Sequence, residues 1–250
     1  MIETNWSGKR VCFLGDSITE GVGGLKVGER YFDLLGAEFG FEACGYGVNG
    51  ASFLDLLKQA EKMHADHGDD VDAIFILAGT NNYYGAMPLG NWFDESVEIV
   101  VAQRGEDGTP KIEERRTKRE FSFDKNTFRG SINTVMSYIR HHYATKQIVL
   151  MTPIHRAFAT FGPTNIQYSE LYSNSIGLFI GDYVGVVREA SSIWSTELID
   201  LHRISGLFPL YDESAGYFLN SETDRLHPNQ AGNMRMARAI ASKLPTIALY

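Results

Sequence analysis

The sequence has little of several features that mark particular classes of protein. Only two of its 250 residues are cysteines, Cys12 and Cys44, so no disulfide framework holds it together. Both lie in apolar stretches, which favours two buried free thiols and is compatible with a reducing compartment. No run approaches the ~18 apolar residues of a membrane-spanning helix, and residues 1–10 lack the apolar core of a secretory signal. We therefore expect a cytoplasmic protein, although a chain whose signal peptide had been removed would look the same.

An excess of positive charge is also missing. Lys and Arg number 23 against 31 Asp and Glu, which gives a net charge of −8. This balance argues against a general nucleic-acid binder and against electrostatic docking on an anionic membrane. The 44% hydrophobic and 12% aromatic content is too apolar for intrinsic disorder. A chain of this length can bury a sizeable core, and we expect a single domain over residues 1–250.

Short apolar runs alternate along the chain with longer amphipathic stretches. The runs are candidate strands, and they lie at Val11–Leu14, Phe41–Cys44, Ala73–Ala78, Gln147–Met151 and Leu198–Leu201. Helical spacing of apolar residues occurs at Ser52–His64, Thr127–Tyr143, Leu171–Ala190 and Asn229–Leu244. Continuously apolar runs suit parallel strands that are covered on both faces. The pattern predicts an α/β fold, a three-layer flavodoxin-like sandwich with a five-stranded, mainly parallel sheet.

One segment departs from this alternation. From Arg104 to Lys125, 13 of 22 residues are charged, seven basic and six acidic. A β-prone stretch precedes it and Gly105–Gly108 is a turn signal, so we interpret residues 97–123 as an inserted β-hairpin. A solvated surface excursion is the simpler role, and a substrate-site flap is an alternative. Because the edges of such a hairpin can pair with another chain, a homo-oligomer formed through it is a further hypothesis.

Four short blocks lie where ligands bind in an open parallel sheet, at the carboxyl ends of its strands. Three follow predicted strands and one precedes the last helix: Gly15–Thr19, Gly47–Gly50, Gly79–Asn82 and Asp224–Pro228. They resemble, in order and spacing, the SGNH hydrolases, also called GDSL-type esterases. The first block reads Gly-Asp-Ser-Ile rather than Gly-Asp-Ser-Leu, and the third reads Gly-Thr-Asn-Asn where the family often has Gly-x-Asn-Asp. Four blocks in order are far more specific than any one of them.

The resemblance implies a serine esterase. It assigns Ser17 as the nucleophile, His227 as the base and Asp224 as the residue that orients the imidazole. It assigns the oxyanion hole to the backbone N–H groups of Ser17 and Gly47 and to the side-chain amide of Asn81. The residue types suit this chemistry, because a serine hydroxyl needs a neighbouring base and an oxyanion needs aimed donors. Each residue taken alone also has a simpler explanation, such as a helix cap, a tight turn or a loop contact.

The substrate is less constrained by the sequence. Without an evident lid helix or long apolar run, we favour short-acyl esters, with O-acetylated carbohydrate as the leading example. Tyr83 and Tyr84 follow Asn81, and His155 and Arg156 follow the fourth predicted strand, so these four are the candidates for substrate contacts. A lysophospholipase or a thioesterase of the same family is the alternative. A non-catalytic binding protein on the same scaffold is a further one.

No cofactor and no metal is expected. Gly45–Gly50 matches the glycine pattern of dinucleotide sites, but Asp66 lies before the next strand rather than at its end, where the ribose partner belongs. No His or Cys spacing typical of a zinc site occurs. The expected partner is therefore a small-molecule or carbohydrate ester.

Overall fold

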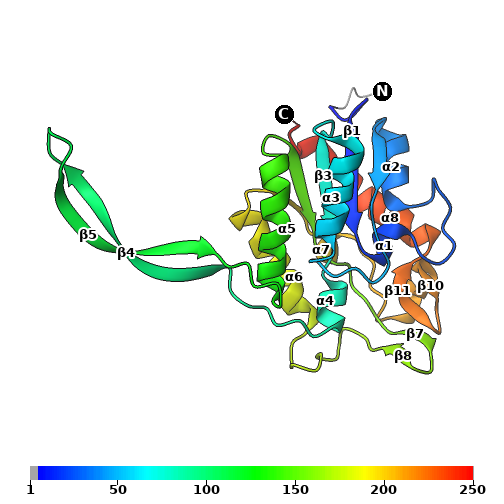
Figure 1. Cartoon of the computed structure of the whole chain (residues 1–250). Coiled ribbons are helices and arrows are strands. Elements are labelled where there is room, and N and C mark those ends of the chain that lie inside the picture. The colour runs from blue at the N-terminus through cyan, green and yellow to red at the C-terminus, as the bar shows by residue number, and fades with distance from the viewer. Residues whose placement is uncertain (1–4, 250) are drawn as a thin grey trace.

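A parallel sheet forms the centre of the computed structural model, which describes residues 5–249 (Figure 1). Its strands are β1 (Arg10–Gly15), β2 (Glu42–Gly45), β3 (Ala73–Leu77), β6 (Gln147–Met151) and β9 (Glu197–Ile199). They pair in the order β2-β1-β3-β6-β9, and every pairing is parallel. This is the flavodoxin-like order of a doubly wound sheet. The predicted fold is confirmed, with a sheet that is parallel throughout.

Helices cover both faces of this sheet and make three layers (Figure 1). One face carries α3 (Leu56–His67), α5 (Phe128–His142) and α6 (Ile180–Ile193), and the other carries α2 (Tyr31–Phe39) and α8 (Gln230–Ala241). In β3, Ile74 and Ile76 pack into the first core, whereas Phe75 and Leu77 pack into the second. Successive side chains of a strand point to opposite faces, so both sets are buried, and the strand is apolar at every position.

The structure corrects several element boundaries. The helix predicted from Leu171 begins only at Ile180, because the Asn174 side chain accepts hydrogen bonds from the backbone of Ile176 and Leu178 and organises a turn instead. The last sheet strand ends at Ile199, and the short helix α7 (Leu201–Ile204) follows. Helix α2 lies between the first two strands, where the sequence pattern predicted no helix. Cys12 is buried as expected, whereas Cys44 is only half-buried.

A second, antiparallel sheet lies beside the carboxyl ends of the central strands. It contains β7 (Ala159–Gly162), β8 (Asn165–Gln167), β10 (Phe218–Asn220) and β11 (Asp224–Pro228), in the order β10-β11-β7-β8. Sequence patterns did not indicate this sheet, because its strands have only three to five residues. Single-turn helices α1 (Ser17–Glu20) and α4 (Thr80–Tyr84), with 3-10 turns at Asp212–Tyr217 and Leu244–Thr246, complete the described elements.

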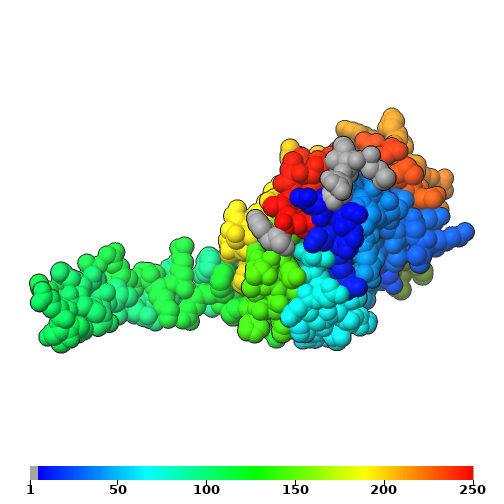
Figure 2. All heavy atoms as spheres, turned by 90° about the horizontal axis from the view of Figure 1, so that it is seen from above, coloured from blue at the N-terminus to red at the C-terminus, as the bar shows by residue number. Residues whose placement is uncertain are grey.

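The charged insertion is a long hairpin of β4 (Phe93–Arg104) and β5 (Pro110–Phe121). It begins a few residues earlier than residue 97, because Phe93 pairs with Phe121 at its base. Both views show it standing away from the rest of the molecule (Figures 1 and 2). Within residues 5–249, no helix has the length and apolar character needed to cross a membrane.

Candidate active site

Ser17 lies at the first turn after β1, at the carboxyl edge of the sheet. Gly15 allows this turn, because a side-chain carbon there would lie 2.2 Å from the Thr19 hydroxyl oxygen. The buried Gln59 of α3 then fixes the end of the strand. Its Oε1 accepts from the Gly15 N–H at 2.9 Å, and its Nε2 donates to the Gly15 carbonyl at 2.8 Å. The nucleophile candidate is therefore held on a rigid support.

His227 and Asp224 reach Ser17 from the antiparallel sheet. His227 Nε2 lies 3.0 Å from Ser17 Oγ, and His227 Nδ1 lies 2.9 Å from Asp224 Oδ2. The other carboxylate oxygen of Asp224 accepts from the backbone N–H groups of Leu226 and His227, each at 3.0 Å. These bonds lock the carboxylate, and the carboxylate in turn orients the imidazole. The structure thus brings together the three residues that the sequence motifs singled out, and places two of them on β11 rather than on the expected loop.

Two carboxyl groups near Ser17 have opposite pKa shifts. Burial tends to raise the pKa of Asp224, but the hydrogen bond and charge of His227, with the backbone bonds, outweigh it and hold that pKa below its ordinary value. Asp16, the N-cap of α1, is completely buried, and this burial raises its pKa to about 6 despite the bond from the Ile18 N–H. Asp224 therefore stays ionised at neutral pH, as a partner for an imidazolium must.

The two other motif residues, Gly47 and Asn81, lie near Ser17 on two separate segments of the chain. A side-chain carbon at Gly47 would lie 2.4 Å from the Glu20 nitrogen, so only glycine lets this loop pack against α1. Asn81, in α4, donates one amide hydrogen to the Ala51 carbonyl at 2.9 Å. This bond fixes the orientation of the amide, which lines the same cavity as Ser17. An amide group has two donor hydrogens, so the second remains available to a ligand.

Asn82 is the residue at which the third block departs from the family pattern. It is buried, and its Oδ1 accepts from the Phe53 N–H at 2.9 Å. An aspartate carboxylate would supply the same acceptor. The exchange therefore leaves the anchoring of this loop intact.

Ser17 and His227 open into a cavity of about 630 Å³. Four amide side chains line it: Asn49, Asn81, Asn165 and Gln167. Apolar contacts come from Val22, Phe161, Leu219 and Leu226. Phe161 is half-exposed, and its ring lies 5.6 Å from the His227 ring, centre to centre. Sequence patterns did not indicate Phe161, Asn165 or Gln167, because these residues lie on the short strands β7 and β8.

The four predicted substrate contacts lie behind this cavity rather than in its lining. Tyr83 is fully buried and donates to the Tyr172 carbonyl at 2.5 Å. His155 Nδ1 lies 2.6 Å from Glu170 Oε1, and Tyr84 packs against Tyr168.

Arg156, the fourth, is also fully buried. Its Nη2 donates to Gln167 Oε1 at 2.7 Å and its Nη1 to the Thr80 hydroxyl at 3.2 Å. Arg156 is therefore linked to the lining of the cavity through Gln167 and is not itself part of that lining.

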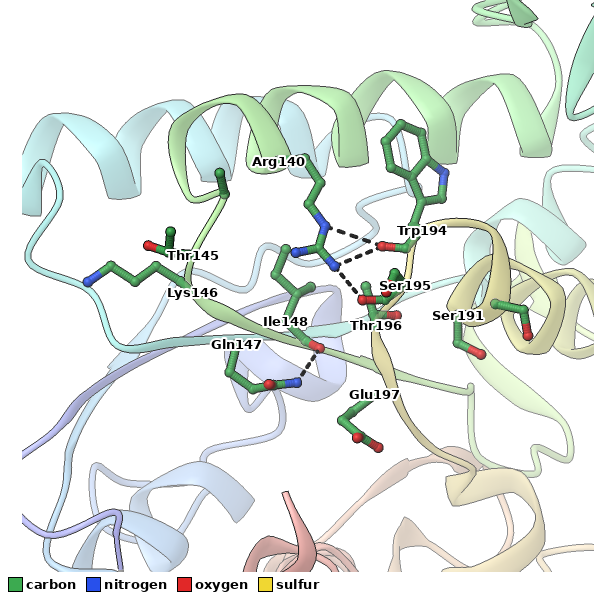
Figure 3. A pocket seen from close by; sticks show the side chains of 12 residues that line it. Arg140, Thr145, Lys146, Gln147, Ile148, Ser191, Trp194, Ser195, Thr196 and Glu197 are labelled. Carbon is green, nitrogen blue, oxygen red and sulfur yellow. Dashed lines mark hydrogen bonds between the residues drawn. The ribbon is translucent and has the colours of Figure 1, made fainter. Parts of the chain in front are cut away.

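A larger cavity, of about 860 Å³, lies at the opposite edge of the sheet. Figure 3 shows Arg140 there, donating to the backbone carbonyls of Trp194 and Ser195. The lining includes the start of β6 and serine and threonine side chains, but no histidine. A serine in this cavity would have no imidazole base, so the smaller cavity at Ser17 is the candidate active site.

Comparison with known proteins identifies the family to which the chain belongs. Residues 13–235 match the model of the GDSL-like lipase/acylhydrolase family. The chain belongs to this family and is a hydrolase of the GDSL type, and membership supports the hydrolysis of ester bonds.

Solved structures share the fold at low sequence identity. A possible lipase from Chitinophaga pinensis superposes with a TM-score of 0.64 at 19% identity, over 93% of this chain and 96% of its own. A variant of an acetyl xylan esterase from Geobacillus stearothermophilus superposes with a TM-score of 0.55 at 19% identity, over 100% of both chains. A protein from Lactobacillus plantarum gives a TM-score of 0.69 at 23% identity, over 96% and 98%. No curated protein matches the sequence.

Proposed function

We propose that the protein is a serine esterase that hydrolyses short-acyl esters through an acyl-enzyme. The observation that carries the proposal is the hydrogen-bonded series from Asp224 through His227 to Ser17, which ends in an open cavity. A serine, an imidazole and an ionised carboxylate at these distances are what activation of a hydroxyl nucleophile requires.

The proposed reaction has two stages, acylation of Ser17 and hydrolysis of the acyl-enzyme. Ser17 Oγ attacks the ester carbonyl carbon while His227 Nε2 takes its proton, and Asp224 stabilises the resulting imidazolium. The backbone N–H groups of Ser17 and Gly47 and the Asn81 amide donate to the oxyanion. As the intermediate collapses, His227 returns the proton to the leaving alcohol and the acyl group stays on Ser17. Water, deprotonated by His227, then attacks the acyl carbon, and the free acid and the serine are released.

The cavity favours a neutral, hydroxyl-rich alcohol. Amide groups both donate and accept hydrogen bonds, and four of them surround a site whose Phe161 offers an aromatic face. This combination suits stacking and hydrogen bonding with a sugar ring better than it suits a long acyl chain. An O-acetylated carbohydrate is therefore the proposed substrate class, in keeping with the acetyl xylan esterase among the structures that share this fold.

A chain-length series of aryl esters, from acetate to decanoate, tests the proposal. We expect the highest kcat/KM on acetate, and we expect Ser17→Ala to abolish turnover and labelling by a serine-directed phosphonate. Ser242→Ala, a surface serine at the end of α8, is the matched control and should retain both. Activity that peaks on decanoate would favour the lysophospholipase or thioesterase alternative. Absence of any hydrolysis and of phosphonate labelling would leave the non-catalytic alternative.

The carbohydrate preference is tested separately with Phe161→Ala. Loss of the aromatic face should raise the KM for an acetylated xylo-oligosaccharide several-fold while changing the KM for aryl acetate much less. Equal changes on both substrates would contradict a sugar-stacking role.

A further inference from the structure

Among residues 5–249, the arm formed by β4 and β5 is anchored to the rest of the molecule at its base. There, the Phe121 ring stacks on Trp194 at 4.4 Å with an interplanar angle of 17°. The Asn133 side chain of α5 donates to the backbone carbonyls of Trp92 and Ser122, which directly precede β4 and directly follow β5. Beyond this anchor the arm projects from the body in both views (Figures 1 and 2). An unsupported two-stranded ribbon is marginally stable in water. We therefore expect a partner to cover a ribbon of this length.

One face of the arm is more apolar than an isolated ribbon should leave uncovered. Alternate residues of a strand share a face, and directly paired residues of neighbouring strands point to the same side. Val97 and Ile99 are therefore on one face, and they are 59% and 69% exposed. We call this the apolar arm face, and it contains Val97, Ile99 and Val101 of β4 with Glu113, Arg115 and Thr117 of β5.

The charges on the apolar arm face complement one another. Arg115 pairs across from Ile99, and Glu113 pairs across from Val101. Nearer the base, Arg119 bonds to Glu95 at 2.8 Å on the same side. The face has one basic and one acidic group, Arg115 and Glu113, and the Glu95–Arg119 pair beside it adds one of each. This side of the arm is therefore complementary in charge to a copy of itself, which is what a two-fold interface requires. A nucleic acid or an anionic membrane would instead need a surplus of basic residues.

We propose that a second copy of this chain covers the apolar arm face, with two arms packed face to face across a two-fold axis. In this arrangement the Val97 and Ile99 side chains of both copies bury each other. Arg115 of one copy faces Glu113 of the other. The proposal is independent of the esterase mechanism, since no arm residue lines the Ser17 cavity.

Mass measurement in solution by sedimentation over a range of concentrations tests the arm contact. The wild type should have twice the 27.9 kDa mass of one chain, and the double variant Val97→Asp/Ile99→Asp should have the single mass. Val100→Asp is the matched control, because Val100 pairs with Glu114 on the opposite face, and it should remain dimeric. Hydrolysis of aryl acetate, or the far-UV circular dichroism spectrum if no ester is turned over, verifies that each variant is folded.

A charge reversal adds a second readout. Arg115→Glu should dissociate the dimer, and Arg115→Glu combined with Glu113→Arg should restore it. A wild type with the single-chain mass at all concentrations overturns the proposal. So does a dimer that persists in Val97→Asp/Ile99→Asp, since the contact would then lie elsewhere.

A separate observation concerns the two cysteines. Cys12 of β1 and Cys44 of β2 are direct partners in neighbouring parallel strands, so their side chains share a face of the sheet. Helix α3 covers that face and ends at His67. The two sulfur atoms and an imidazole nitrogen of His67 all lie within 4.8 Å of one another. Sequence spacing gave no sign of this cluster, because the three residues are far apart in the chain and meet only through the fold.

The donor set of this cluster suits a soft metal ion. Thiolate sulfur and imidazole nitrogen are the preferred ligands of Zn²⁺. Cys44 and His67 are only half-buried, which gives an ion a route of entry. The Tyr46 ring meets the His67 ring edge-on at 6.3 Å and helps to hold it in place.

We infer that Cys12, Cys44 and His67 form a binding site for one Zn²⁺ ion, with a fourth position open to water. The site joins β1, β2 and the end of α3, so an ion there would cross-link elements that lie far apart in the sequence. Because the ion binds the folded chain, it should raise the midpoint of thermal unfolding.

Titration of the fully reduced protein with Cd²⁺ and Zn²⁺ tests the site. We expect thiolate-to-metal absorption that saturates at one Cd²⁺ per chain, with Zn²⁺ competing for it. Cys44→Ser should lose the signal, and His67→Gln should weaken binding at least tenfold. His64→Gln is the control, because His64 lies one turn earlier on α3 and contacts Tyr143 instead. Absent absorption, or binding unchanged in both Cys44→Ser and His67→Gln, overturns the inference.

Discussion

The edge of the sheet at Ser17 and the arm differ in how their charged residues are placed. At the edge, Asp16, Asp224 and His227 are nearly or completely buried, and each forms hydrogen bonds with residues two or three positions away in the chain. In the arm, the ion pairs of Glu95 and Glu98 with Arg119 and Lys118 are exposed on a ribbon that is fixed at its base.

This difference shows what each region is suited for. Burial strengthens electrostatic interactions and shifts pKa values, so a few groups at the edge can be preset for proton transfer. Exposed charges are screened and contribute little to stability, but they favour a partner whose surface charges are complementary. The edge is therefore suited to the proposed chemistry, whereas the arm is suited to the proposed contact with a second copy. Substitutions in the two regions should differ accordingly.

The largest expected effect is that of Ser17→Ala. Removing the nucleophile should lower kcat for aryl acetate by roughly 10⁴- to 10⁶-fold, because only the oxyanion donors and substrate binding remain. Unfolding followed by circular dichroism should show nearly wild-type stability, since only a hydroxyl is lost. A fall of less than tenfold in kcat would show that Ser17 is not the nucleophile. Substitutions at the edge and in the arm would then not differ in their effect on activity as expected.

Asn81→Ala should have the next largest effect. Loss of one oxyanion donor typically lowers kcat by about 10²- to 10³-fold, and KM should change little because the bond forms mainly in the transition state. Asn126→Ala serves as a control, since Asn126 is an exposed turn residue. An effect confined to KM would instead indicate that Asn81 binds the ground-state substrate.

Asp16→Asn should change how stability depends on pH. Burial raises the folded-state pKa of Asp16 from 3.8 to about 6. As the pH rises, the unfolded chain therefore loses this proton at a lower pH than the folded chain does. Stability is then greatest below the unfolded pKa and falls as pH rises through this window. The asparagine oxygen can still accept from the Ile18 N–H, but it carries no charge. The free energy of unfolding of the variant, relative to that of the wild type, should therefore increase by about 3 kcal/mol between pH 4 and pH 7.

Urea unfolding of both proteins at pH 4, 5 and 7 measures this gain. Equal slopes of stability against pH would show that Asp16 titrates normally. The edge would then lose one of the buried charges that set it apart from the arm.

The smallest effect is expected in the arm. Lys118→Ala removes ion pairs to Glu98 and Glu120, but all three side chains are well exposed and screened. We expect no measurable shift in the midpoint of thermal unfolding and unchanged kcat/KM. A shift comparable to that of a buried substitution would show that the arm is covered along this side too.

Local patterns determined much of this protein from the sequence alone. The apolar runs predicted the five central strands to within a few residues. The signal is strongest for β1, β3 and β6, because strands buried on both faces must be almost wholly apolar. Glycine and turn signals predicted the hairpin. The four motif blocks identified Ser17, Gly47, Asn81, Asp224 and His227 before their positions were known, because motif residues keep their order in the chain.

Only the tertiary structure decided which residues surround these five. The small sheet that carries Asp224 and His227 pairs residues 224–228 with residues 159–162, which lie far apart in the chain, so no local pattern predicts it. It supplies Phe161, Asn165 and Gln167 to the cavity and leaves Arg156 behind it. The meeting of Cys12, Cys44 and His67 arises in the same way. Sequence periodicity reports which side of an element is buried, whereas the residues that meet across a site depend on long-range packing, which that periodicity does not encode.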